Sequence, residues 1–221
     1  MTDHPGRSNE GPADRRPLGD SIGDQPIGPA LTTPPELAER VVDSRTIHRG
    51  KYMEFRVLTI ERADGSRGTR EIVWHPGAVA ILAIDEQDRV LMVRQWRVAV
   101  GGALLEIPAG TLDVDAATGE IEDPDGAAAR ELEEETGYRA RTWQKLGSFW
   151  TAPGFATELM HLYLATDLTP ADGERLGPDE DERLELERVP WREAVAAAER
   201  GEIADGKSLV GLLRLGRLRT A

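Results

Sequence analysis

Residues Gly126–Tyr138 read GAAARELEEETGY, a short stretch in which an alanine run leads into four glutamates and a Thr-Gly pair. Successive residues of an α-helix rotate by about 100° around its axis. Glu131, Glu134 and Glu135 therefore share one face of the helix that this stretch predicts. The helix is expected to end at Gly137, because glycine readily adopts the left-handed conformation of a helix C-terminal cap.

Three carboxylates on one helical arc repel one another unless a cation lies among them. All-oxygen ligation suits Mg²⁺ or Mn²⁺ better than zinc. The simpler interpretation is a solvated acidic face, but such helices usually carry lysines four residues from their glutamates, and this one has none. Glu133 is expected to point away from the shared face, while Ala128 and Leu132 supply apolar contacts for a core. The stretch therefore indicates an acidic metal-binding helix.

The surrounding residues resemble the Nudix box, G-x5-E-x7-R-E-U-x-E-E-x-G-U, in which U is apolar or aromatic. Gly110, Glu122 and Arg130–Tyr138 match it, with the required seven residues between Glu122 and Arg130. Eleven residues, Thr111–Ile121, separate Gly110 from Glu122, where the pattern has five. Because Asp, Thr and Gly punctuate this stretch, we interpret the excess as a six-residue insertion in a loop. It leaves the helix register intact and the role of Glu122 open.

The Nudix resemblance implies a hydrolase that cleaves a nucleoside diphosphate linked to another moiety. Divalent cations serve such chemistry because they neutralise phosphate charge and lower the pKa of bound water. The resemblance assigns metal ligation to Glu131 and Glu135 first, to Glu134 third, and to the backbone carbonyl of Ala109. The implied cofactor is Mg²⁺, with Mn²⁺ as a substitute. Arg130 is expected to orient one of these carboxylates.

Residues outside the box resemble the ADP-ribose pyrophosphatase subfamily, which would release AMP and ribose 5-phosphate from ADP-ribose. Pro153 resembles the marker proline of this subfamily, and Gln95–Arg97 and Leu105–Gly110 resemble two further signatures. Each has a plainer alternative, namely a Pro-Gly turn for Pro153, an exposed salt bridge for Arg97 and a core position for Trp96. The candidate substrate-binding residues are Arg97, Arg70, Pro153, Gly154, Glu158, Tyr52 and Phe55.

A general base is needed to take the proton of the attacking water. Alignment of the apolar Leu184 with the resembling subfamily places Glu180 at the base position, with Glu182 as the second candidate. Glu158 and Glu134 are the remaining candidates. The plain alternative is that residues 177–183 form a flexible acidic loop without a catalytic role.

Two other functions fit the same residues. One is hydrolysis of another nucleoside diphosphate sugar or a dinucleotide, which the pocket side chains would decide. The other is a non-catalytic ADP-ribose sensor on a Nudix scaffold. A sensor of this kind usually has lost a box carboxylate or gained a nucleic-acid-binding extension. This chain keeps all three box glutamates and begins with an acidic segment, so both features disfavour the sensor.

Composition limits the partners. The 221 residues carry a net charge of −13, which argues against a nucleic-acid partner, since phosphate-backbone binding needs clustered Lys and Arg. The absence of cysteine excludes disulfides, thiol catalysis and Cys–zinc sites. No apolar stretch approaches the ~20 residues of a membrane span, and the N-terminus lacks the apolar segment of a secretory signal. We therefore expect a soluble cytoplasmic protein without a membrane partner. The small nucleoside diphosphate substrate is what the Nudix resemblance implies.

The chain is expected to have three parts. Residues 1–36, rich in Gly, Pro, Asp and Ser, are expected to form a disordered tail. Segment 37–75 opens with a short turn at Glu36–Val42 and is expected to form an antiparallel hairpin from Ile47–Ile60 and Arg70–Trp74. In the resembling subfamily such a segment pairs across a two-fold axis and contributes to the partner's adenosine pocket, so a homodimer is expected. Residues 76–221 would form the Nudix hydrolase domain.

The order of elements predicts the fold class. Beyond the hairpin, apolar runs predict strands at 78–84, 90–93, 103–107, 143–150, 159–165 and 184–189. Amphipathic periodicity predicts helices at 191–200 and 205–218 in addition to the acidic helix. This order predicts an α/β fold, a Nudix-type α/β/α sandwich with a mixed sheet, preceded by the N-terminal antiparallel β-hairpin.

Overall fold

The computed structural model describes residues 32–171 and 183–220. Contacts within the chain define two compact units. The first contains residues 32–75 together with Gly154–Ala156, and the second contains Pro76–Pro153 and residues 157–171 and 183–220. Most of the tail expected over residues 1–36 lies outside the described residues. No helix in the described ranges is long and apolar enough to cross a lipid bilayer.

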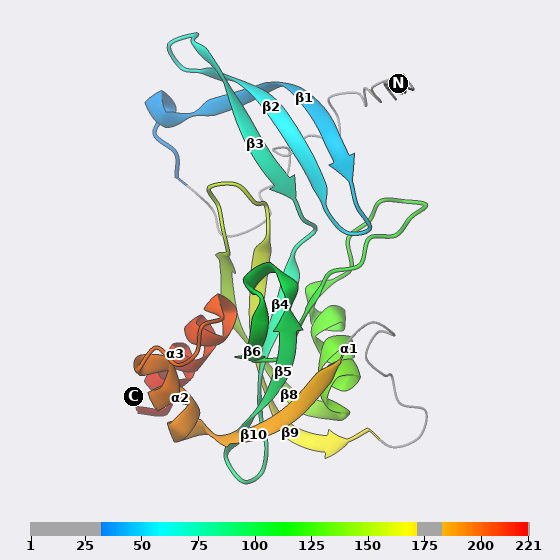
Figure 1. Ribbon diagram of the computed structural model, residues 1–221, viewed down its shortest axis with the longest axis vertical. Helices are drawn as coiled ribbons and strands as arrows, with labels where there is room; N and C mark the ends of the chain where they lie inside the picture. Colours follow the sequence, from blue (N-terminus) through cyan, green and yellow to red (C-terminus); the bar gives the residue numbers. More distant parts are fainter. Residues whose placement is uncertain (1–31, 172–182, 221) are drawn as a thin grey trace, which may run out of the picture. The chain divides into compact units, whose positions relative to one another are not determined.

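The first unit is a three-stranded antiparallel sheet in the order β1-β2-β3 (Figure 1). Its elements are the 3₁₀ turn η2 (Pro35–Leu37), β1 (Glu39–Arg49), β2 (Glu54–Arg62) and β3 (Arg67–Trp74). The expected hairpin is β2–β3. Its turn contains Gly65 at a φ of 79°, and the Asp64 side chain accepts a hydrogen bond from the Ser66 N–H. Positive φ at a turn is a conformation that glycine adopts without steric cost.

The expectation for residues 36–60 is wrong in two places. A turn was expected at Glu36–Val42, but β1 begins at Glu39. Most side chains of β1 are exposed. Its residues are therefore mostly polar and do not show the alternation of apolar and polar residues that usually marks a strand. The single strand expected over Ile47–Ile60 instead divides into the end of β1, a turn and β2. The Gly50 N–H donates to the Met53 carbonyl oxygen at 2.8 Å and closes this turn.

The second unit is built on a seven-stranded mixed sheet. The order is β10-β5-β4-β9-β8, with β6 paired to β5 and β7 paired to β4. Strands β4 and β9 run parallel, and the other pairs are antiparallel. Its strands are β4 (Ala78–Ile84), β5 (Arg89–Arg97), β6 (Gly102–Glu106), β7 (Ala109–Thr111), β8 (Tyr138–Trp150), β9 (Leu159–Pro170) and β10 (Leu184–Pro190). Its helices are η3 (Val98–Val100), α1 (Pro124–Thr136), α2 (Trp191–Glu199) and α3 (Gly206–Thr220).

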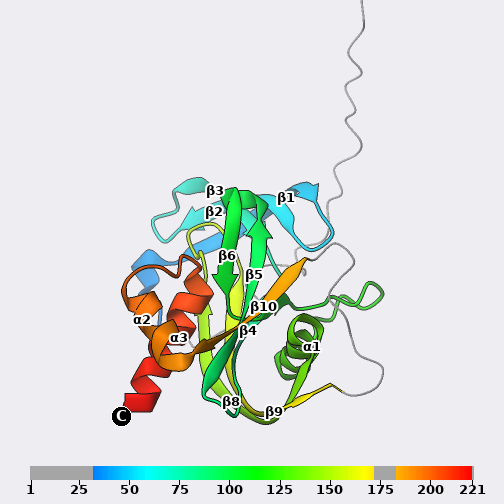
Figure 2. The ribbon, with the colours of Figure 1, turned by 60° about the horizontal axis from the view of Figure 1, so that its bottom comes forward.

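Helices cover both faces of this sheet, with α1 on one side and α2 and α3 on the other (Figure 2). Successive residues of a strand point to opposite faces, and β4 is buried along its whole length. Ala80 and Leu82 belong to the core that contains α2 and α3, whereas Val79 and Ile81 belong to the core that contains α1. The α/β/α sandwich expected from the sequence is therefore confirmed.

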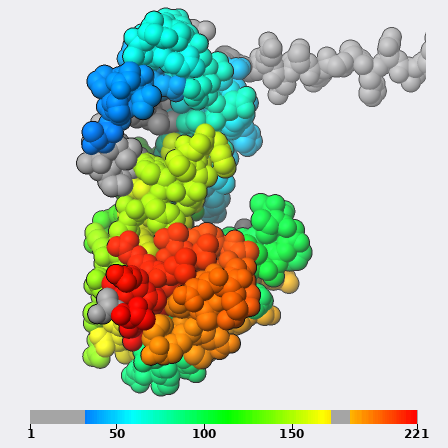
Figure 3. Space-filling view, turned by 90° about the vertical axis from the view of Figure 1, so that its left-hand side faces the viewer, coloured from blue at the N-terminus to red at the C-terminus, as the bar shows by residue number. Residues whose placement is uncertain are grey.

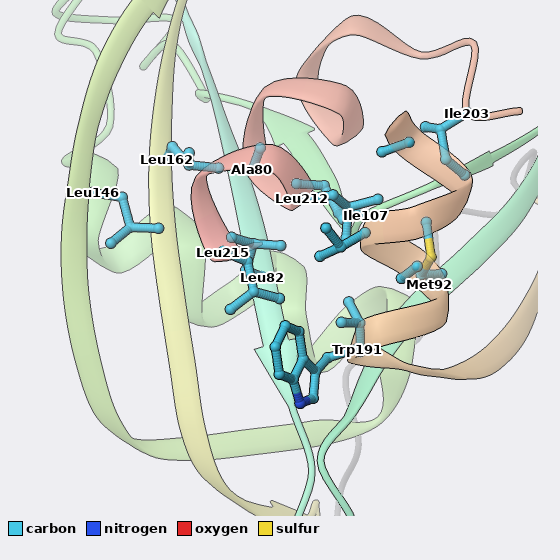
Figure 4. Packing of buried hydrophobic residues seen from close by; sticks show 14 of the residues in the cluster. Ala80, Leu82, Met92, Ile107, Leu146, Leu162, Trp191, Ile203, Leu212 and Leu215 are labelled. Atoms are coloured by element: carbon cyan, nitrogen blue, oxygen red, sulfur yellow. The ribbon is translucent and has the colours of Figure 1, made fainter. Parts of the chain in front are cut away.

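The larger core lies between the sheet and the pair α2–α3 (Figure 4). Trp191 of α2 and Leu212 of α3 share this core with Leu82 and Ile107. Helix α3 approaches the sheet so closely at Gly211 that a β-carbon there would lie 3.1 Å from Cδ1 of Ile107. The opposite sides of α2 and α3 form the orange and red surface in Figure 3.

The acidic helix α1 has a stabilising residue at each end. Asp123 is the N-cap, and its carboxylate accepts from the Gly126 N–H at 3.3 Å. Pro124 occupies the first turn, where its missing N–H has no helical partner to lose. At the other end Gly137 has a φ of 71° and donates its N–H to the Glu133 carbonyl oxygen. The helix end expected at Gly137 is confirmed.

Candidate active site

Strand β7 brings the backbone against the carboxylates of α1. A β-carbon built on Gly110 would lie 1.9 Å from both Cδ and Oε1 of Glu131. The space that any larger residue would need is therefore filled by the Glu131 carboxylate. One residue earlier, the Ala109 N–H donates to Oε2 of Glu135 at 3.1 Å. Strand β7 thus holds two of the box glutamates, Glu131 and Glu135, in place.

Arg130 forms hydrogen bonds with three carboxylates of the box. Its Nη1 donates to Oε1 of Glu131 at 2.7 Å and to Oε2 of Glu134 at 2.8 Å. Its Nε and Nη2 donate to the two oxygens of Glu122 at 3.2 and 2.8 Å. Hydrogen bonding to Arg130 lowers the pKa of Glu122, and hydrogen bonding to Glu122 raises the pKa of Arg130. Arg130 orients three carboxylates rather than the one expected, and Glu122, whose role the sequence left open, anchors it.

The insertion between Gly110 and Glu122 folds as a compact turn. Asp115 accepts from the N–H groups of Ala117 and Thr118 at 2.8 and 2.7 Å. The Glu122 N–H then donates to the Asp113 carbonyl oxygen at 2.8 Å. Through these bonds the inserted residues form a closed turn. At its end Glu122 lies within hydrogen-bond distance of Arg130.

Glu133 lies outside this cluster. It is 7% exposed, and its oxygens accept from Nε and Nη2 of Arg139 at 2.6 and 2.7 Å. Arg139 belongs to β8, so this ion pair ties α1 to the sheet. The Glu133 side chain differs from the three box glutamates in its partner, although it is buried like Glu131 and Glu135.

The donor set of α1 suits a hard divalent cation. Glu131, Glu134 and Glu135 offer carboxylate oxygens, and Ala109 adds a backbone carbonyl, which is the ligand type that Mg²⁺ and Mn²⁺ prefer. Among the described residues, no group of three His, Asp or Glu side chains converges closely enough to hold a metal ion. Arg130 is instead the positive partner of two of them. The residues fit the cation in chemistry and in helical spacing.

A cavity of about 680 Å³ in the second unit borders the box at Ala109–Thr111. This volume lies within the range of ligand pockets for small molecules. Phe149 and Trp150 of β8 supply aromatic surface. The charged and amide side chains that line the cavity are Gln95, Arg97, Glu106, Glu158, Asp205 and Lys207.

A buried carboxylate lies at the wall of this cavity. Glu106 is 1% exposed and accepts two hydrogen bonds from Arg97, at 2.8 Å from Nε and 2.7 Å from Nη2. Lys207 of α3 forms a second ion pair with Oε2 of Glu106. Burial alone would raise the pKa of Glu106, but hydrogen bonding and charge from Arg97 and Lys207 hold that pKa below its ordinary value. Glu106 therefore remains an anion within the wall.

The structure brings part of the predicted site together. Ala109, Arg97 and Glu158 line the cavity, and Glu131 lies directly behind Gly110 at its edge. Pro153 and Gly154 are not among the described residues that line the cavity. The core position expected for Trp96 is wrong, because this side chain is 61% exposed.

The other predicted residues lie elsewhere. Tyr52, Phe55 and Arg70 belong to the first unit, where Arg70 pairs with Glu39. Glu180 and Glu182, two of the candidate bases, lie outside the described residues. Sequence reasoning missed Lys207 and Glu106. Glu106 stands inside the Leu105–Gly110 motif and could have been singled out there, whereas a lysine in an amphipathic helix carries no comparable signal.

Comparisons with known proteins identify relatives. A model of the NUDIX domain matches residues 74–209. The chain is 39% identical over 172 residues to an ADP-ribose pyrophosphatase of Bacillus subtilis, covering 78% of this chain and 89% of that protein. It is 33% identical over 175 residues to a GDP-mannose pyrophosphatase of Cronobacter sakazakii, covering 74% and 88%. A solved structure described as an ADP compounds hydrolase has a TM-score of 0.67 at 24% identity, covering 81% of this chain and 93% of that one. This last likeness concerns the fold alone.

Proposed function

The chain belongs to the Nudix hydrolase family, and from this premise we propose that it is a Mg²⁺-dependent pyrophosphatase that converts ADP-ribose to AMP and ribose 5-phosphate. The observation that carries the proposal is the placement of the box. Ala109, Gly110 and Thr111 line the cavity, and the first two also lie against the glutamates of α1, Ala109 at Glu135 and Gly110 at Glu131. A diphosphate in the cavity would therefore lie beside the box carboxylates. The relative from Bacillus subtilis supports ADP-ribose as the substrate.

Arg97 is the proposed contact for the diphosphate. A guanidinium forms paired hydrogen bonds with phosphate oxygens as well as with carboxylates. Its Nε and Nη2 already bind Glu106, which fixes the plane of the guanidinium at the cavity wall. The Arg97 side chain is 41% exposed, so a ligand can reach it.

The metal would be held by Glu131, Glu134, Glu135 and the Ala109 carbonyl. When bound, a divalent cation neutralises charge on the phosphate oxygens and lowers the pKa of a water molecule. Arg130 holds two of the carboxylates, and the Ala109 N–H holds the third. These contacts fix each carboxylate singly. Among the described residues the three do not converge on one point, so a bound cation would draw their oxygens together.

We assign proton removal from the attacking water to Glu180, with Glu182, Glu158 and Glu134 as alternatives. As the water oxygen bonds to phosphorus, its proton passes to the base. The bond from that phosphorus to the bridging oxygen then breaks, and the leaving phosphate takes the electron pair. Glu158 lines the cavity and accepts a hydrogen bond from the Thr151 hydroxyl.

The base can be identified by comparing the Gln variants of Glu180, Glu182 and Glu158 at saturating Mg²⁺. Replacement of the base should lower kcat by about 10²–10⁴-fold. If all three retain activity, the role passes to Glu134.

The substrate is tested by a hydrolysis screen with ADP-ribose, ADP-glucose, GDP-mannose and NADH, each with Mg²⁺ and with EDTA. We expect the highest kcat/KM for ADP-ribose, with AMP as a product and no turnover in EDTA, because the phosphate charge would then lack its counter-ion. A higher kcat/KM for GDP-mannose would transfer the proposal to that substrate, which the Cronobacter sakazakii relative supports. Tight binding of ADP-ribose without hydrolysis of any compound would indicate a sensor.

We also propose a homodimer formed largely through residues 45–75. The first unit exposes several large apolar side chains, namely Ile47, Tyr52, Met53 and Phe55. Exposed apolar strands of this kind favour association with a second chain. Tyr52, Phe55 and Arg70 are the proposed contributions to the partner's adenosine pocket. Removal of residues 1–36 is expected to leave the dimer intact, and a monomeric mass by light scattering at micromolar concentration would contradict the proposal.

A further inference from the structure

Lys207 is an unusual residue in this chain. The sequence contains 27 lysines and arginines together, of which only Lys51, Lys145 and Lys207 are lysines. Lys145 is an exposed surface residue, with 66% of its side chain accessible, whereas the Lys207 side chain is 9% exposed. Burying an ammonium group costs free energy unless anions compensate it. A lysine in such a position therefore has a specific set of partners.

The partners of Lys207 connect α3 to the substrate cavity. Its ammonium group forms an ion pair with Oε2 of Glu106 and another, at 3.1 Å, with Oδ2 of Asp205. Glu106 in turn holds Arg97 through two hydrogen bonds. All four side chains line the cavity. The contacts thus run from the first turn of α3 through β6 to the end of β5.

The geometry of Glu106 depends on both cations. Arg97 binds both of its oxygens, while Lys207 binds Oε2 from the α3 side. Without Lys207, a carboxylate that is 1% exposed would have Arg97 as its one basic partner among the described residues. The Arg97 guanidinium alone would then have to neutralise the negative charge of Glu106. The attraction of Arg97 for a second anion, such as a phosphate, would decrease accordingly.

We propose that Lys207 is a positioning residue for diphosphate binding, acting on Arg97 through Glu106. The proposal rests on the proposed function, since it takes the diphosphate as the ligand of Arg97. Lys207 supplies a second positive charge to the Glu106 carboxylate. The guanidinium then keeps both its orientation and a surplus of positive charge at the cavity wall.

A purely structural role is the competing explanation. Asp205 caps α3 by accepting from the Ser208 N–H at 2.9 Å, and Lys207 contacts the same carboxylate. The Ser208 hydroxyl also accepts from the Ile107 N–H at 2.8 Å. Loss of Lys207 could therefore loosen the start of α3. The two explanations differ in one respect, because only the positioning role requires Arg97.

The test measures the dissociation constant for ADP-ribose by calorimetry in EDTA, where no turnover interferes. The variants are Lys207→Met, Arg97→Ala and the combination of both, with Lys145→Met as the matched control for a lost lysine charge. We expect Lys207→Met to raise Kd about 10-fold and Lys145→Met to leave it unchanged. In the Arg97→Ala background, Lys207→Met should change Kd less than 2-fold, because residues that act through one another are not additive.

Two results would overturn the proposal: an unchanged Kd for Lys207→Met, or equal fold-changes of Lys207→Met with and without Arg97. If Lys207→Met does not fold, Lys207→Met combined with Glu106→Gln removes the buried anion together with its partner. This double variant should fold and still bind weakly, and wild-type affinity in it would defeat the proposal. Wild-type turnover of ADP-ribose tests the proposed function separately. A wild type that binds ADP-ribose without hydrolysing it would contradict that function and leave the Lys207 comparison valid.

Discussion

Replacement of Glu135 or Glu131 by glutamine is expected to lower kcat by about 10²–10³-fold, because each exchange removes a negative charge from the proposed metal site. Glutamine has nearly the same shape as glutamate, so the packing of α1 should change little. Glu135 is 7% exposed and accepts from the Ala109 N–H, a bond that the glutamine carbonyl can retain. The measurement is kcat for ADP-ribose as a function of Mg²⁺ concentration, together with the melting temperature of each variant.

Glu133→Gln is the matched control, since this residue lies on the same helix and is equally buried. It pairs with Arg139 rather than with the box cluster. Its replacement should therefore act on stability, at a cost of about 1 kcal/mol for a weakened ionic hydrogen bond to a half-exposed arginine. The kcat of the folded protein should stay near the wild-type value. If Glu133→Gln reduced kcat as strongly as Glu135→Gln, the assignment of the site to one helical face would be wrong.

Gly110→Ala is expected to lower kcat about 10²-fold while the protein still folds. The new β-carbon would lie 1.9 Å from the Glu131 carboxylate, which must move away. Because the obstacle is the end of a flexible side chain, the cost in stability should stay within the ~1–3 kcal/mol typical of overpacking. The displaced carboxylate would leave the proposed metal site. Thermal unfolding and kcat, measured on the same preparation, separate the two effects.

Gly126→Ala is the control for this exchange. Gly126 lies in the first turn of α1, and apart from its chain neighbours and the adjacent helix backbone no heavy atom would come within 4 Å of its added β-carbon. Alanine favours helix more than glycine does, so this variant should be equally or more stable and fully active. A Gly110→Ala enzyme with wild-type kcat would show that the reaction does not need Glu131 at the position it occupies beside β7.

The predictions that succeeded depended on local patterns. The face shared by Glu131, Glu134 and Glu135 follows from helical spacing, and the end of α1 follows from Gly137. The strand at β4 needed no knowledge of distant residues either, because a strand buried on both faces reads as one apolar run. Patterns of this kind act over a few residues, so a single sequence contains them in full.

The predictions that failed depended on tertiary contacts. Strand β1 was missed because its side chains are mostly exposed, so only pairing with β2 identifies it. A core position, the plainer alternative for Trp96, rested on its residue type, but in β5 this side chain is exposed. Lys207 and Glu106 are 101 residues apart in the sequence, and no local signal connects them. The role of Glu180 or Glu182 as the general base stays a prediction, because both lie outside the described residues.

The compact turn between Gly110 and Glu122 shows that the loop in front of the acidic helix can vary in length at little cost. Closing a loop of eleven residues instead of five costs only about 0.7 kcal/mol in chain entropy. An ionic hydrogen bond contributes about 1.5–3 kcal/mol, and Glu122 forms two with Arg130. The loop ends, rather than the number of residues between them, are therefore under energetic constraint. This turn is consequently a suitable place to introduce a fluorescent label or a short peptide tag, because its tip can grow while Glu122 stays in contact with Arg130.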